Sequence, residues 1–142
     1  MQMNRIILAS HAGMSAGIKD TLQMVLGELP NLYVVATTRD ESETIVTVTR
    51  RLLENFEPGD QVAILTDILG GSVNNDMMTL LTDYSDIRII CGMNLSLVLS
   101  LAMHTEPWTG EIIRDAIHQA KEQIIDCTEM IKGSAAEDGG DL

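Results

Sequence analysis

Apolar residues recur along this chain in two alternating periods. Four short runs are nearly continuous and rich in β-branched residues, as expected of parallel strands that are covered on both faces. They span residues 5–9, 32–36, 62–65 and 87–91. The segments between them carry apolar residues at helical spacings of three and four. This alternation predicts an α/β protein with an open, mostly parallel, doubly wound sheet and right-handed crossovers.

The same pattern predicts where the helices lie. The pair Asp40 and Glu43 resembles a capping box in front of a second helix. A third helix is expected just after Ser72, and a fourth over residues 95–103. The inward positions of the first helix are Ile18, Leu22, Val25 and Leu29. A single long final helix is predicted from Ile113, Ile117, Ala120, Ile124, Cys127 and Ile131.

Length and composition define the domain. The chain has 142 residues, the size of one domain, and 45% of them are hydrophobic, enough for a proper core. From Gly133 onward the sequence turns to Gly, Ser, Ala and acidic residues. We therefore expect one domain over residues 1–132 and an acidic, Gly-rich, disordered tail over residues 133–142.

Charge and cysteine content exclude several classes of protein. The net charge of -12 repels nucleic acid and anionic membranes. The chain contains neither a membrane-length apolar stretch nor the residue order of a signal peptide, so a cytoplasmic protein is expected. Cys91 and Cys127 match neither metal-ligand spacing nor a disulfide framework, and are expected to be buried free thiols.

The chemistry is expected where the first and third strands end. Ser10 and His11 follow the first strand, and Asp67 follows the third. In a flavodoxin-like strand order these two strands are neighbours, about 4.8 Å apart, at the edge where such sheets bind ligands. A hydrogen bond from His11 to Asp67 would fix the tautomer of the ring and leave its far nitrogen free as a nucleophile.

A second motif, TDILGGSVNN at residues 66–75, continues from Asp67. Gly70 and Gly71 allow consecutive backbone N–H groups to turn toward one point, Ser72 adds a hydroxyl, and a helix is expected to begin there. We call Gly70, Gly71 and Ser72 the anion cradle. The motif contains no lysine or arginine, so a phosphoryl group held there by neutral donors is expected to be handed on readily.

Three familiar kinds of site fit these residues less well. The Gly-Gly-Ser sequence lacks the lysine of a nucleotide P-loop, and Asn74 stands where a hydrolase elbow needs glycine. No acidic pair follows the first strand to hold the magnesium ion of a phosphoaspartate site. A structural role for His11 remains open, although the matching strand-end position of Asp67 disfavours it. Neither His104 nor His118 is expected to carry chemistry, and Trp108 is expected to anchor the loop before the final helix.

The motifs ASH at residues 9–11, MVLG at residues 24–27 and TDILGGSVNN resemble the mannose-type IIA component of the bacterial phosphoenolpyruvate-dependent sugar phosphotransferase system (PTS). The resemblance covers residues 4–131. It departs from the family pattern at Ala12, where glycine is common, at Val73, where proline is usual, and at Leu69, where some members carry an aromatic residue.

The resemblance implies a function and partners. His11 matches the phosphorylated histidine, Asp67 the carboxylate that orients it, and Gly70, Gly71 and Ser72 the loop around the phosphoryl group. It implies a homodimeric phosphotransferase, without metal or cofactor, that accepts a phosphoryl group from the phosphocarrier protein HPr. The group then passes to a IIB component, and the membrane is reached only through the IIC/IID permease.

Two other functions stay open at this point. The cradle would serve equally in a module that senses a phosphorylated metabolite without chemistry at His11. The phosphotransfer subunit of dihydroxyacetone kinases uses a similar domain. The identity of the sugar does not follow from these residues, because the permease makes the contacts with it.

Overall fold

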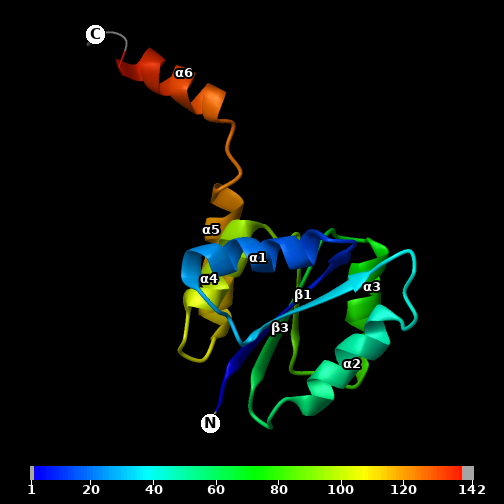
Figure 1. Ribbon diagram of the computed structural model, residues 1–142. Helices are drawn as coiled ribbons and strands as arrows, with labels where there is room; N and C mark the ends of the chain where they lie inside the picture. The colour runs from blue at the N-terminus through cyan, green and yellow to red at the C-terminus, as the bar shows by residue number, and fades with distance from the viewer. Residues whose placement is uncertain (1, 139–142) are drawn as a thin grey trace.

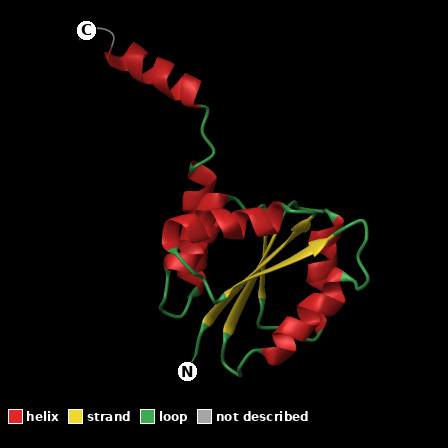
Figure 2. Ribbon diagram, in the orientation of Figure 1, coloured by secondary structure: helices red, strands yellow, loops and turns green. Residues whose placement is uncertain are grey.

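The structure is a computed structural model that describes residues 2–138. Its centre is a four-stranded sheet with the order β2-β1-β3-β4, in which every neighbouring pair is parallel. Helices cover both faces of the sheet (Figure 2). The predicted α/β class, the doubly wound sheet and the flavodoxin-like strand order are confirmed. The strands are β1 (Asn4–His11), β2 (Leu32–Thr37), β3 (Gln61–Thr66) and β4 (Arg88–Cys91).

Successive residues of the central strands enter two different cores, one on each side of the sheet. Ile6 and Leu8 of β1 pack on one face, whereas Ile7 and Ala9 pack on the other. Because both faces are covered, every one of these positions is apolar, which produces the continuous runs in the sequence. The first face is covered by α1 (Met14–Leu26), α4 (Leu95–Met103) and α5 (Gly110–Glu122). The second is covered by α2 (Ile45–Asn55), α3 (Ser72–Thr79) and the short 3-10 helix Leu80–Thr82.

The first two helices differ from the prediction in one inward position and in one cap. Helix α1 ends at Leu26 because Gly27 takes the left-handed conformation, with φ at 82°. Val25, predicted to face the core, lies in the last turn of the helix and is 70% exposed. Helix α2 is capped by Thr44, whose hydroxyl accepts from the Thr47 N–H at 3.2 Å, and not by the predicted box at Asp40.

The single long final helix is also wrong, because the chain forms two helices there. Helix α5 ends at Glu122, and Asp126 begins a new one by accepting the Glu129 N–H on its side chain at 3.1 Å. The second helix, α6 (Cys127–Asp138), stands away from the sheet (Figure 1). Ile124 and Ile131, predicted to be buried, are 79% and 65% exposed.

Helix α6 also bears on the predicted tail and on the thiols. A disordered segment was expected from Gly133, but residues 133–138 continue α6, and the proposed boundary at residue 132 falls inside this helix. Residues 139–142 lie outside the described part of the chain. Cys127 is exposed and Cys91 is half-buried, so the expectation of two buried thiols was wrong. Within residues 2–138, no helix has the length and apolar character needed to cross a membrane.

A buried ion pair closes the end of the sheet that lies opposite His11. The Asp60 side chain is 1% exposed and accepts from Arg5 Nε at 2.9 Å and from the Met3 N–H at 3.0 Å. Arg5 also donates to the Tyr33 hydroxyl at 2.8 Å and lies over the Phe56 ring. Burial alone would raise the pKa of Asp60, but the hydrogen bonds from Arg5 and two backbone N–H groups outweigh it and lower the pKa.

We expect Asp60→Ala to lower the free energy of unfolding by about 3–5 kcal/mol, because it leaves Arg5 charged and largely unpaired. The pKa of Asp60 is lower in the folded chain than the ordinary carboxyl pKa of about 3.9. Ionised Asp60 therefore contributes its full share to the free energy of unfolding above that ordinary pKa, and the contribution is lost as pH falls through the folded-state pKa. Urea unfolding between pH 3 and 7 measures both effects. The exposed Asp86→Ala is the control, and equal acid sensitivity of Asp60→Ala and the parent chain would contradict this role.

Candidate functional site

The ends of β1 and β3 bring an imidazole and a carboxylate into contact. His11 is the last residue of β1, and Asp67 follows the last residue of the neighbouring β3. His11 Nδ1 lies 2.7 Å from Asp67 Oδ2, so the predicted pair is present in the geometry. The His11 side chain is half exposed, while that of Asp67 is 10% exposed. The carboxylate is thus held inside the edge of the sheet, and the imidazole faces outward.

Asp67 is fixed by backbone groups as well as by the ring. Its Oδ2 accepts the His11 N–H at 2.8 Å, and its Oδ1 accepts the Ile68 N–H at 2.9 Å. Burial alone would raise the pKa of Asp67, but these hydrogen bonds and that of the ring outweigh it and lower the pKa. The carboxylate is therefore ionised at neutral pH and accepts the proton on Nδ1. That tautomer leaves the lone pair on Nε2 of His11.

Nε2 of His11 faces the anion cradle. Ser72 Oγ lies 3.0 Å from Nε2, a contact that the sequence did not reveal. Ser72 is the first residue of α3. The first backbone hydrogen bond of the helix runs from the Asn75 N–H to Gly71 O at 3.0 Å. The N–H groups of Ser72, Val73 and Asn74 have no acceptor among the described residues. They are free to bind an anion beside Nε2, with the helix dipole in support.

Gly70 and Gly71 were expected to let consecutive backbone N–H groups turn toward an anion, and the structure shows other roles for them in the loop. The Gly71 N–H donates to Ile68 O at 3.2 Å and is not turned toward an anion. Gly70 has φ at 79°, which turns the loop back toward His11. A side chain at Gly71 would meet Ile68 Cγ2 at 2.7 Å and His11 Cε1 at 3.8 Å. Gly71 therefore allows the loop to approach the imidazole closely.

If His11 accepts a phosphoryl group, as the sequence resemblance implies, Gly71→Ala should lower the rate of that reaction by about tenfold, because the new methyl group displaces the Ile68 loop from the imidazole. Gly13→Ala is the matched control, since a side chain there meets nothing within 4 Å and Gly13 flanks the same histidine. Single-turnover labelling of both variants gives the comparison. Equal rates for the two variants would contradict the requirement for close approach.

The segment that carries His11 is fixed by buried residues to which the sequence analysis gave no role. The buried Ser10 Oγ accepts the Ser15 N–H at 2.9 Å, which fastens the start of α1 to the end of β1. Between them Ala12 has φ at 51°, the only positive value for a non-glycine residue among the described residues. Such a conformation costs an alanine roughly 1–2 kcal/mol. A serine at the inward position before a strand-end histidine was the available signal.

Side-chain hydrogen bonds also fix the loop that contains the anion cradle. Thr66, at the end of β3, donates its hydroxyl to Asn74 Oδ1 at 2.7 Å, and both residues are buried. Asn75 Nδ2 donates to Gly70 O at 3.3 Å. These bonds join the strand before the loop to the helix after it. Thr66 and Asn74 lie in the quoted motif, but nothing in the sequence separated them from ordinary core positions.

The arrangement suits nucleophilic catalysis by an imidazole. Asp67 orients the ring and stabilises the cation that forms when Nε2 attacks, and the N-terminus of α3 supplies neutral donors for an anion. Among the side chains that the structure describes, no cluster of three or more from His, Cys, Asp or Glu is placed to hold a metal ion. His118 is largely exposed on α5, and His104 lies at the end of α4, so neither joins this site.

Comparisons with known proteins find similar sequences and folds among PTS components. A family model described as the PTS system fructose IIA component matches residues 5–118. The chain is 25% identical over 136 residues to the PTS system sorbose-specific EIIA component of Lacticaseibacillus casei. That alignment covers 94% of this chain and 97% of the relative.

Solved structures with the same fold come from related systems. A Klebsiella pneumoniae protein assigned to the phosphoenolpyruvate-dependent sugar phosphotransferase system superimposes with a TM-score of 0.81 at 28% identity, over 92% of this chain and 95% of its own. The phosphotransferase system component EIIA of Streptococcus agalactiae has a TM-score of 0.77 at 24% identity, over 89% and 98% of the two chains. The second likeness supports the fold alone.

Proposed function

Because the chain belongs to the EIIA-man family of PTS IIA components, we propose that it is a phosphocarrier in sugar uptake with His11 as the phosphorylated residue. The observation that carries the proposal is the double contact of the imidazole. Nδ1 lies 2.7 Å from Asp67, and Nε2 lies 3.0 Å from Ser72 in the anion cradle. One nitrogen is thus occupied by a carboxylate, and the other faces neutral donors.

The proposed transfer is in line and needs no other covalent chemistry. The lone pair on Nε2 forms a bond to the phosphorus of phospho-HPr while the bond from phosphorus to the donor nitrogen breaks. The Ser72 hydroxyl turns from Nε2 to the phosphoryl oxygens, joined by the free N–H groups of α3. The proton on Nδ1 stays in place, and Asp67 balances the positive charge on the ring. In the second transfer the same steps run outward, to a IIB component of a mannose-family PTS.

Exposed apolar side chains lie near His11 and Asp67 along the chain and fit the docking of a protein donor. Met14, Ile68 and Leu69 are 44%, 61% and 77% exposed, and all three lie within a few residues of His11 or Asp67 in the chain. We expect Leu69→Asp to lower kcat/KM for transfer from phospho-HPr by about tenfold, because it removes apolar contact worth about 1–2 kcal/mol. Phosphorylation by the small donor phosphoramidate should be unchanged.

The matched control for that change is Met24→Asp, since Met24 is 86% exposed on α1 and lies away from His11 in the sequence. Stopped-flow or quenched-flow transfer from phospho-HPr separates the two variants. An equal loss with both donors for Leu69→Asp would indicate damage to the site, and no loss with either would contradict docking at this surface.

Incubation with phosphoenolpyruvate, the general phosphotransferase enzyme and HPr tests the proposed function. We expect one covalent phosphoryl group per chain that is labile in acid and stable in base, as for a phosphohistidine, and that is lost on addition of the IIB partner. Reversible binding of phosphate esters without covalent label would instead favour the sensing module.

The proposal extends to where and with what the protein works. A phosphocarrier between HPr and IIB acts in the cytoplasm, and it reaches the membrane only through the IIC/IID permease that takes up the sugar. A homodimer is proposed as well, and the exposed apolar residues before and on α6 support it, because they have little contact with the rest of the domain. They are Ile124, Ile125, Met130 and Ile131. Sedimentation of the full chain at the mass of one chain would contradict the dimer.

A further inference from the structure

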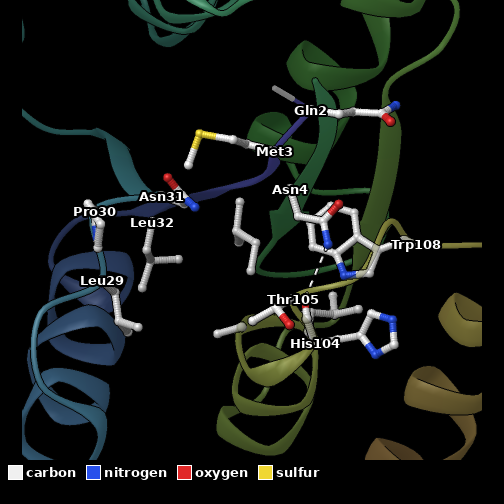
Figure 3. A pocket seen from close by; sticks show the side chains of 13 residues that line it. Gln2, Met3, Asn4, Leu29, Pro30, Asn31, Leu32, His104, Thr105 and Trp108 are labelled. Carbon is white, nitrogen blue, oxygen red and sulfur yellow. Dashed lines mark hydrogen bonds between the residues drawn. The ribbon is translucent and has the colours of Figure 1, made fainter. Parts of the chain in front are cut away.

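A cavity of about 260 Å³ lies at the opposite end of the sheet from His11. It is lined by Asn4 and Leu32, which begin β1 and β2, and by the chain that follows α4. Figure 3 shows Leu29, Pro30 and Leu32 on one side of it and His104 and Trp108 on the other. His11 is seven residues along β1 from Asn4, so roughly 20 Å separate the cavity from the phosphorylation site.

The lining of this cavity selects against charged molecules. None of its residues is Asp, Glu, Lys or Arg, and its walls are largely apolar. A charged group entering such a space would lose its hydration without gaining an ionic partner. Apolar cavities of about 150 Å³ already hold benzene, so this one has room for an aromatic ring with a substituent. The apolar part of the wall comes chiefly from Ile6, Leu29, Leu32, Leu101, Ala102 and Trp108.

Two residues that line the cavity carry a buried nitrogen atom without a hydrogen-bond partner. Among the described residues, three buried side-chain polar atoms lack a hydrogen-bond partner, and two of them are Trp108 Nε1 and His104 Nε2. Trp108 is 3% exposed, so its indole N–H is shielded from water as well as unpaired. An unpaired buried donor costs free energy in the empty protein, which a ligand carrying an acceptor would recover.

Hydrogen bonds hold this wall open. Asn4 Nδ2 donates to Glu106 O at 2.7 Å and to His104 O at 3.2 Å, and the second bond is drawn in Figure 3. The Gln61 side chain donates to the backbone carbonyl oxygen of Trp108 at 2.9 Å and accepts the backbone N–H of Trp108 at 2.6 Å. The loop after α4 is thus fastened to the starts of β1 and β3. It cannot move inward to fill the cavity without breaking these bonds.

From these observations we infer that the cavity is a binding site for a small, uncharged, mainly apolar molecule that carries a hydrogen-bond acceptor. The acceptor receives the indole N–H of Trp108 after a small side-chain adjustment of the wall, and the rest of the molecule occupies the apolar space. This site is separate from His11 and does not depend on the proposed phosphoryl transfer.

The only tryptophan of the chain supplies the test. In a nitrogen-15 correlation spectrum of the full chain, the single indole N–H signal reports directly on the cavity. Acetophenone, ethylbenzene and benzoate share one ring and differ in their polar group. We expect acetophenone to shift the indole signal downfield and saturably, ethylbenzene to bind without a downfield shift, and benzoate to have no effect. An indole signal that none of the three perturbs would overturn the inference.

Three variants keep the test independent of folding. Ala102→Phe fills the cavity and should abolish acetophenone binding, whereas Met103→Phe, at an exposed position of the same helix, should not. Trp108→Phe removes the N–H donor together with one ring of the indole, so ethylbenzene binding measures the effect of the lost ring. Ligand-detected spectra should then show acetophenone binding weakened by about threefold to tenfold more than ethylbenzene binding. Unaltered acetophenone affinity in Trp108→Phe, or in folded Ala102→Phe, would overturn the assignment.

Discussion

Replacing His11 with alanine is expected to abolish phosphoryl acceptance completely. Nε2 of His11 is the only nucleophile in the site with a lone pair aimed at the anion cradle, 3.0 Å from Ser72 Oγ. The Ser72 hydroxyl has no general base beside it other than this imidazole, so the serine cannot replace it. The measurement is the transfer of radiolabel from phosphoenolpyruvate through HPr to the purified variant.

Its control is His118→Ala. That side chain is 75% exposed on α5, and its Nε2 lies 4.0 Å from Glu122 Oε1. We expect full labelling of His118→Ala and a thermal unfolding midpoint for His11→Ala close to that of the parent chain. Label incorporated into His11→Ala would show that another residue accepts the phosphoryl group, and the assignment would fail.

Asp67→Ala is expected to slow the transfer by about 10- to 100-fold without abolishing it. The variant keeps the nucleophile but loses the carboxylate that fixes the tautomer and supports the cation. The expected size is that seen for the hydrogen-bond partners of metal-ligating histidines. Because hydrogen bonds lower the pKa of Asp67, the carboxylate is ionised across the neutral range in the parent chain. The loss should therefore be present at every pH from about 5 to 8.

Single-turnover rates across that pH range provide the measurement, and Asp76→Ala provides the control. Asp76 is an exposed acid on α3, so it matches the change in charge without touching the imidazole. Two outcomes would contradict the orienting role. One is a rate for Asp67→Ala equal to that of Asp76→Ala, and the other is a complete loss equal to that of His11→Ala.

The sequence was sufficient to predict the sheet and the pairing of His11 with Asp67. Strands covered on both faces give continuous apolar runs, and the topology of parallel strands then brings His11 and Asp67 to one edge. Both steps rest on general rules of α/β folds. The contact between Ser72 and Nε2 of His11 could not be predicted from the sequence, because it depends on how closely the loop approaches the imidazole. Gly71 and the bond from Thr66 to Asn74 control that approach.

The end of the chain was less predictable for a physical reason. Residues 113–131 keep a helical period throughout, so periodicity alone cannot find a break. The break comes from Asp126, which caps a new helix with its side chain. The exposure of Ile124 and Ile131 likewise follows from where α6 lies and not from its composition. Their apolar character led to the wrong prediction that they are buried.

The most direct test of the central claim identifies the nitrogen that carries the phosphoryl group. Histidine labelled with nitrogen-15 in the phosphorylated full chain gives a long-range proton–nitrogen spectrum in which the two ring nitrogens of His11 are distinct. We expect phosphorylation at Nε2, with Nδ1 protonated and bound to Asp67. Phosphorylation at Nδ1, or on a residue other than His11, would contradict the claim.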